Sequence, residues 1–246
     1  MSPWPRRALF FAFTAASFAL LAGAAALASG LGHRFGLWDY RFAFTLLRYA
    51  AWTGAAGALL SLGALGWVLA LRLRAAAFAA AAGVVAGALA FGVPSMALQE
   101  ARRVPPIHDI STDTANPPAF VALLAARRAA PNGADYAGEA LAEQQRKGYP
   151  DIAPLAVAAP PPAAFERSLA AARALGWTIV AADLNALRIE ATDMTPFFGF
   201  KDDVVIRITP AGEASRVDVR SMSRVGRSDL GTNARRIRAF TRELAR

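Results

Sequence analysis

Three long apolar stretches near the amino terminus constrain the fold of this chain more than any other feature. They run from about Ala8 to Ser29, from about Leu46 to Leu71 and from about Ala75 to Leu98. Each reaches the roughly 20 residues that an α-helix needs to cross about 30 Å of hydrocarbon. A helix is required because lipid offers no partner for unpaired backbone groups. We therefore predict a transmembrane region of three helices within residues 1–100.

Charged residues divide the chain into two halves of different character. Residues 1–99 hold seven arginines and one acid, Asp39, whereas residues 100–246 hold twenty basic and seventeen acidic residues. Much of the formal net charge of +9 therefore flanks the apolar stretches, so we do not expect a nucleic-acid partner. The middle third of each stretch is free of the charges that transporters and proton relays use. This half is predicted to be an anchor.

Arginine placement predicts the orientation of the anchor. Arg6 and Arg7 precede the first stretch, and Arg72 and Arg74 lie in the short link between the second and the third. Such clusters favour the cytoplasmic side, which puts the amino terminus inside and the polar half outside the cytoplasm. The alternative for the first stretch is a cleaved signal peptide. Gly83 and Gly87 form a small-xxx-small pair that allows close helix packing.

The polar half, residues 104–246, is predicted to be an α+β domain. The patterns predict helices that start at Pro117 after Asn116, run from Tyr136 to about Lys147, run from Ala163 to Leu175, and start near Asp229. Between the last two, alternating apolar positions predict four strands with short turns at 183–185 and 210–212. Four sequential strands form an antiparallel meander, with one apolar face packed against helices and one face of alternating charge.

Several blocks of the polar half resemble a known family. These blocks are 107–114 (IHDISTDT), 188–192 (RIEAT), 198–207 (FGFKDDVVIR) and 219–231, joined by Tyr149-Pro150-Asp151. Together they are similar to the domain of unknown function 1499 family, over nearly all of the polar half and none of the membrane half. The resemblance implies a protein of the bacterial envelope and no assigned reaction. With the orientation above, it predicts an inner-membrane protein with a periplasmic domain.

A first set of candidate site residues combines imidazole, carboxylate and hydroxyl groups. It comprises His108, Asp109, Ser111 and Asp113, with Lys201, Asp202 and Asp203 further along. Imidazole and carboxylate together suit a divalent metal or acid/base chemistry. The alternative is a turn in which Asp and Ser side chains bond their own backbone. A metal site needs three or four convergent ligands and the chain has no cysteine, so we expect no metal or other cofactor.

A second set points to anion binding. Arg220, Ser223, Arg224 and Ser228 lead into the last helix, whose amino terminus offers free N–H groups to a phosphate or carboxylate. The alternative is that Ser228 or Asp229 caps the helix and that the arginines pair with Asp202 and Asp203. We expect internal pairing, because the charged strands are neighbours.

Three aromatic residues, Phe197, Phe198 and Phe200, crowd one strand connection. They either contact the bilayer interface or an apolar ligand, or fold back onto the core. Taken together, the sequence favours a membrane-anchored binding module whose ligand is a lipid, an envelope component or a protein.

Two alternatives remain open. One is a metal-dependent hydrolase or anion-handling enzyme built on eight residues: His108, Asp109, Asp113, Lys201, Asp202, Asp203, Arg220 and Arg224. It requires these side chains to converge. The other is a structural subunit of a membrane complex that docks through the charged strand face of Arg188, Glu190, Arg207, Asp218 and Arg220.

Overall fold

A computed structural model describes residues 3–246 as two compact units. Of the described residues, the helical unit comprises 3–99 with 196–199, and the sheet unit comprises 100–195 with 200–246.

Three α-helices form the helical unit: α1 (Trp4–Arg34), α2 (Tyr40–Ala70) and α3 (Arg74–Ala101). All three are long and apolar enough to cross a membrane. Helices α1 and α3 extend beyond both ends of the apolar stretches that predicted them, and α2 begins several residues before its stretch. Asp39 begins α2, since its carboxylate accepts the backbone N–H groups of Arg41 and Phe42 at 2.7 and 3.1 Å.

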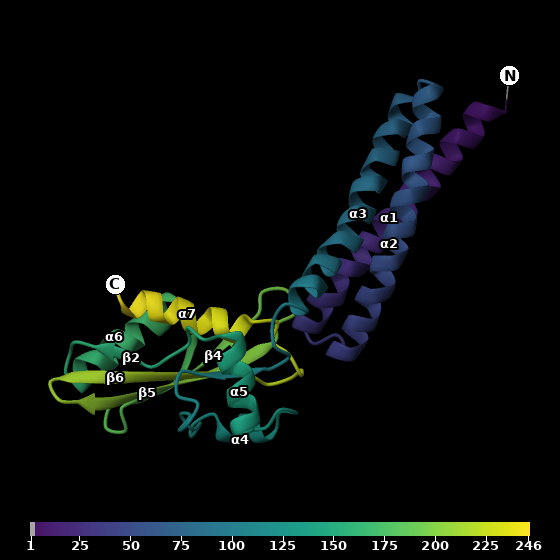
Figure 1. Ribbon diagram of the computed structural model, residues 1–246. Coiled ribbons are helices and arrows are strands. Elements are labelled where there is room, and N and C mark those ends of the chain that lie inside the picture. Colours follow the sequence, from purple (N-terminus) through teal and green to yellow (C-terminus); the bar gives the residue numbers. More distant parts are fainter. Residues whose placement is uncertain (1–2) are drawn as a thin grey trace. The chain divides into compact units, whose positions relative to one another are not determined.

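Small residues let these helices pack closely. A Cβ atom at Gly87 would lie 2.3 Å from the carbonyl oxygen of Gly54, and one at Gly83 would lie 2.8 Å from Cα of Ala16. The small-xxx-small pair therefore lies where α3 contacts both other helices. At the end of the unit that holds the amino terminus and the α2–α3 link (Figure 1), Ala8 packs with Val68 of α2.

The sheet unit is built on a single antiparallel sheet with strand order β1-β6-β5-β4-β3, in which β2 also pairs with β6. The strands are β1 (Asp109–Ser111), β2 (Leu155–Val157), β3 (Thr178–Asp183), β4 (Arg188–Met194), β5 (Lys201–Ala211) and β6 (Ala214–Ser223). The predicted four-strand meander is confirmed as β3-β4-β5-β6. The short strands β1 and β2, which the sequence analysis missed, share the outer edge of β6.

Four helices accompany this sheet: α4 (Leu124–Arg128), α5 (Glu139–Gly148), α6 (Pro161–Ala174) and α7 (Thr232–Leu244). Figure 1 shows α6 and α7 on one side of the sheet and α4 on the other. Phe165 and Leu169 of α6 and Ile237 and Phe240 of α7 pack on the apolar strand face. The α+β fold class is as predicted.

The helix predicted to start at Pro117 is wrong, because only Leu124–Arg128 is helical in that region. The backbone N–H groups of Val121, Ala122 and Leu123 instead donate to the carboxylate of Glu190 at 2.8, 3.0 and 2.8 Å. A side chain of β4 thus holds the turn that precedes the short helix. The helix predicted from Tyr136 also starts later, at Glu139, and the one predicted near Asp229 starts at Thr232.

The charged face of the sheet is covered. Phe120 and Leu123 of the segment that leads into α4, together with Ala126 of α4, pack on Val205 and Met222. Four charged residues of this face are buried, namely Glu190, Asp203, Asp218 and Arg220, whereas Arg188 and Arg207 are half-buried. Three of the five residues of the proposed docking surface therefore lie inside the sheet unit.

Candidate functional site

The segment around β1 combines turn chemistry with a buried ion pair. Asp109 accepts two hydrogen bonds from the Arg220 guanidinium, at 2.9 and 2.8 Å, and both residues are buried. Asp113 accepts the N–H groups of Ala115 and Asn116 at 3.2 and 2.9 Å, which is the local turn that the sequence offered as an alternative. Ser111 closes the same turn by donating to the carbonyl of Asp113 at 2.9 Å.

Gln145 of α5 protects the outer edge of β1. Its amide oxygen accepts the Ser111 N–H at 2.9 Å, and its amide nitrogen donates to the Ser111 carbonyl at 2.6 Å. The side chain thus replaces the missing neighbouring strand, and the edge is closed to further pairing. Gln145 is itself buried, which makes this contact part of the fold.

Arginine–aspartate pairs hold the charged face together. Asp203 accepts two bonds from Arg224, at 2.9 and 2.8 Å, and lies 3.4 Å from Arg127. Asp218 lies 2.9 Å from Arg207 and 3.0 Å from Arg216. Burial lowers the pKa of Arg127, and the neighbouring Asp203 opposes that shift. The expected internal pairing is found for Arg224, whereas Arg220 pairs with Asp109.

A separate polar cluster lies where α7 meets the opposite face of the sheet. Arg236 bridges Asp202 and Asp193, both at 2.8 Å. Asn233 accepts from the Ser221 hydroxyl at 2.7 Å and donates to the Ser223 hydroxyl at 3.0 Å. Since successive side chains of a strand point to opposite faces, Asp202 and Asp203 belong to different clusters.

The amino terminus of α7 is capped from within. Asp229 accepts the N–H groups of Gly231 and Asn233 at 2.8 and 2.7 Å, and Ser228 accepts that of Leu230 at 3.3 Å. Burial raises the pKa of Asp229, while these hydrogen bonds act in the opposite direction. The groups that an anion would use at this end are therefore bonded to the chain's own side chains.

A polar cavity opens beside β1 and the start of α5, and we call it the His108 cavity. Its volume is about 400 Å³. Its polar lining comes from His108, Asp109, Asn132, Asp135, Gln144 and Arg227. The His108 Nδ1 atom lies 3.4 Å from the carbonyl oxygen of Arg227, so the ring is held at the rim of the cavity. Neither the Asp135 carboxylate nor the Arg227 guanidinium forms an ion pair within residues 3–246.

The structure brings together some of the predicted residues and separates others. His108 and Asp109 share the cavity, whereas Asp202 and Arg224 lie in the two other clusters described above. Lys201 is exposed at the start of β5. Among the described residues, no group of three or more His, Cys, Asp or Glu side chains is arranged to hold a metal ion.

The three phenylalanines also divide. Phe197 and Phe198 lie in the segment that groups with the helical unit, with their rings 5.0 Å apart, and Phe198 contacts Phe44 at 5.1 Å. Phe200 belongs to the sheet unit, where its N–H donates to the Thr195 hydroxyl at 2.9 Å. Their predicted role at an interface stays a prediction.

Sequence reasoning missed several residues of these clusters, above all Arg127, Gln145, Asn233 and Arg236. Arg127 is fully buried, and the sequence analysis assigned it no role. The sequence could have indicated that Arg236 is buried. It follows Asn233 by one helical turn, on the side of α7 that also carries the buried Ile237. Asp135 directly precedes the helix predicted from Tyr136, and nothing in the local sequence distinguished it as a cavity residue.

These features define a class of protein: three membrane-length helices joined to an α+β domain whose sheet carries buried ion pairs on both faces. The family model "Protein of unknown function (DUF1499)" matches residues 109–244, so the chain belongs to this family. A comparison with curated proteins gives no match.

Proposed function

We propose that this protein is a membrane-anchored, extracytoplasmic module that binds a small charged component of the cell envelope in the His108 cavity. One observation carries the proposal. The cavity exposes a carboxylate, Asp135, and a guanidinium, Arg227, that have no ion-pair partner in the described chain. Most of the other charges around β1 are paired, so Asp135 and Arg227 are charges close to β1 that remain for a ligand.

The chemistry of the lining suggests the class of ligand. Arginine suits a carboxylate or phosphate, and an aspartate suits an ammonium group. A ligand that carries both groups would satisfy both side chains, with His108 and Gln144 as further hydrogen-bonding partners. The volume falls within the roughly 300–1,000 Å³ that is usual for small-molecule pockets.

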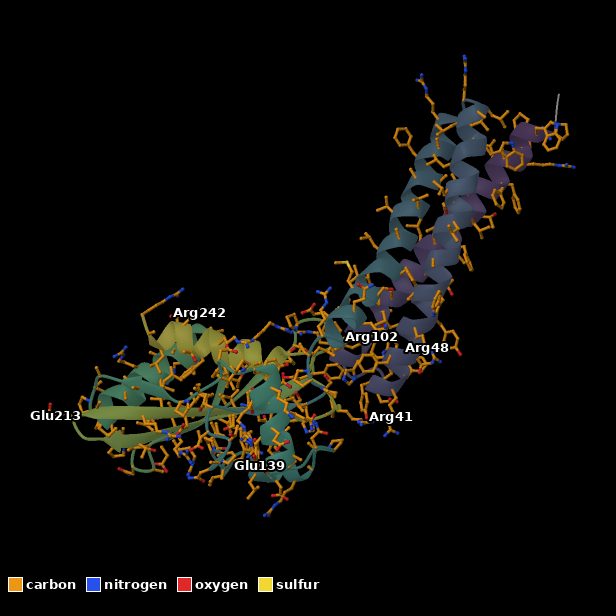
Figure 2. All side chains as sticks on the ribbon, viewed as in Figure 1. Arg41, Arg48, Arg102, Glu139, Glu213 and Arg242 are labelled. Atoms are coloured by element: carbon orange, nitrogen blue, oxygen red, sulfur yellow. The ribbon has the colours of Figure 1, made fainter. Side chains whose placement is uncertain are left out.

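Calorimetric titration of the full chain in detergent tests this proposal. The probes are glycerophosphoethanolamine and the dipeptide alanylalanine, which both carry a cation and an anion. Asp135→Asn and Arg227→Gln should each weaken binding about tenfold, as expected for one charged hydrogen bond. Glu139→Gln on α5 is the control, because Glu139 is exposed and lies outside the cavity lining (Figure 2). No heat of binding for either probe, or equal effects of all three variants, would overturn the proposal.

The extracytoplasmic location is a second part of the proposal. Packing of Ala8 with Val68 supports a common end of the helical unit for Arg6, Arg7, Arg72 and Arg74. The opposite end carries Asp39 among its arginines, and Arg41 and Arg48 lie toward it in Figure 2. The two arginine clusters at the first end favour the cytoplasm, and three spans then place the sheet unit outside. Alkaline phosphatase fused after Arg246 should be active, whereas fluorescence of a cytoplasm-specific reporter at that position would contradict this orientation.

A further inference from the structure

The tight link between α2 and α3 projects two arginines from one end of the helical unit. Arg72 adopts a left-handed backbone conformation with φ of 56°, and the Leu73 N–H donates to the Val68 carbonyl at 2.9 Å. This turn places Arg72 and Arg74 two residues apart, both exposed. Neither guanidinium forms an ion pair within residues 3–246.

An apolar groove of about 340 Å³ begins at these two arginines. Its walls include Leu65 and Leu69 of α2 and Ala77, Phe78 and Ala81 of α3. From Arg74 to Ala81 the groove follows seven residues of helix, or about 10 Å at 1.5 Å per residue. Leu69 and Phe78 are exposed in the isolated chain. The groove therefore offers apolar walls to a hydrocarbon chain whose charged end reaches the arginines.

The residues around the groove favour a negatively charged ligand. Arg6 and Arg7 at the start of α1 lie at the same end of the helical unit, as the packing of Ala8 with Val68 requires. Asp39 is the single acid among residues 1–99, and it caps the opposite end of α2. Four cations thus gather at one end without an acid of the same unit beside them.

We propose that this groove binds an anionic phospholipid, with the phosphate between Arg72 and Arg74 and an acyl chain along Phe78. Arginine pairs geometrically with phosphate oxygens, and basic pockets between transmembrane helices on the cytoplasmic side hold anionic headgroups. The inference rests on the membrane anchoring in the proposed function and adds a lipid partner to it.

Native mass spectrometry of the full chain in detergent tests the proposal with phosphatidylglycerol and phosphatidylcholine as probes. Phosphatidylglycerol should be retained preferentially. Arg72→Gln with Arg74→Gln should weaken its retention about thirtyfold, because each arginine near an anionic surface contributes about 1 kcal/mol, or about fivefold. The matched control, Arg41→Gln with Arg48→Gln, removes the same charge from the other end and should retain the lipid.

A second variant tests the groove without touching its charges. Ala81→Phe fills the apolar part, and it should reduce the retention of phosphatidylglycerol while both arginines remain. Free glycerol phosphate in excess should not displace the lipid, because it lacks the acyl chain. Equal retention of both lipids by the native chain, loss of retention in the control pair, or displacement by glycerol phosphate would each overturn the proposal. A chain absent from the membrane fraction would instead refute the anchoring itself.

Discussion

The buried pair between Arg220 and Asp109 gives the sharpest test of how this domain is held together. Arg220→Met removes the guanidinium and keeps an unbranched apolar side chain of comparable length. Asp109 is 1% exposed, so its carboxylate would then be buried without a counter-charge. Arg220 also donates to the carbonyl oxygens of Pro118 and Ala134 at 3.3 and 3.1 Å. The substitution therefore affects three acceptors at once.

These contacts set the expected magnitude. Breaking a buried ion pair by removing one partner costs about 3–5 kcal/mol. The Arg220 guanidinium also lies over two rings, 5.2 Å from the centre of Phe120 and 5.4 Å from that of Tyr136. Desolvated cation–π contacts of this kind are worth up to about 2 kcal/mol, which places the cost toward the upper end of the range. We expect Arg220→Met to lower the free energy of unfolding by about 4–5 kcal/mol.

Pulse proteolysis of the full chain in detergent and urea measures this loss, because the sheet unit becomes cleavable when it unfolds. With a urea dependence of about 2 kcal/mol per molar, the midpoint should fall by about 2 M. The double variant Arg220→Met with Asp109→Leu removes both charges. It should be more stable than Arg220→Met alone by about 2 kcal/mol or more, because no unpaired charge is left buried.

Arg238 supplies a matched control. It forms two hydrogen bonds of 2.6 Å with Asp151, as Arg220 does with Asp109, but the two side chains are 34% and 52% exposed. Arg238→Met should cost less than about 1 kcal/mol, the usual value for a surface pair. Equal losses for Arg220→Met and Arg238→Met would refute the argument that burial makes the first pair important. So would a double variant that is less stable than Arg220→Met.

Three further outcomes are expected. Glu190→Gln should lower the free energy of unfolding by about 2 kcal/mol in the same assay, because it disturbs three N–H donors that share one carboxylate. An unchanged urea midpoint would contradict a stabilising role for these hydrogen bonds. Gly87→Leu should lower the thermal stability of the helical unit by at least about 1–3 kcal/mol, measured by circular dichroism, whereas Gly63→Leu points into open space and should not. The Tyr149 hydroxyl is buried without a hydrogen-bond partner in residues 3–246, and burial raises its pKa from 10.0 to about 12. The folded chain holds that proton more tightly than the unfolded chain, so this stabilisation is complete below pH 10 and is lost as the pH rises through about 12. Tyr149→Phe should be neutral to slightly stabilising at pH 7 and should reduce the alkaline loss seen by circular dichroism; a marked loss at pH 7 would show that the hydroxyl has a partner.

Local sequence pattern was enough to predict the long helices and the longer strands. Apolar runs of membrane length leave a chain few alternatives to helices, so α1, α2 and α3 followed directly from composition. Alternation of apolar and polar residues likewise revealed strands β3 to β6, whose neighbours in the sheet are also neighbours in the chain. The short strands β1 and β2 escaped, because three residues carry no readable period and their partner β6 is distant in sequence.

The partners and the burial of the charged residues depend on the tertiary structure. Alternating charge along β4, β5 and β6 looks the same in a sequence whether that face meets water or protein. Here the segment with Phe120 and Leu123 covers it, so Glu190 holds the turn before α4 and Arg220 is the partner of Asp109. The same long-range packing leaves Asp135 and Arg227 unpaired beside His108, which local pattern had no means to reveal. Ion pairing depends on distances of about 3–4 Å between residues up to 111 positions apart, and only the folded chain sets those distances.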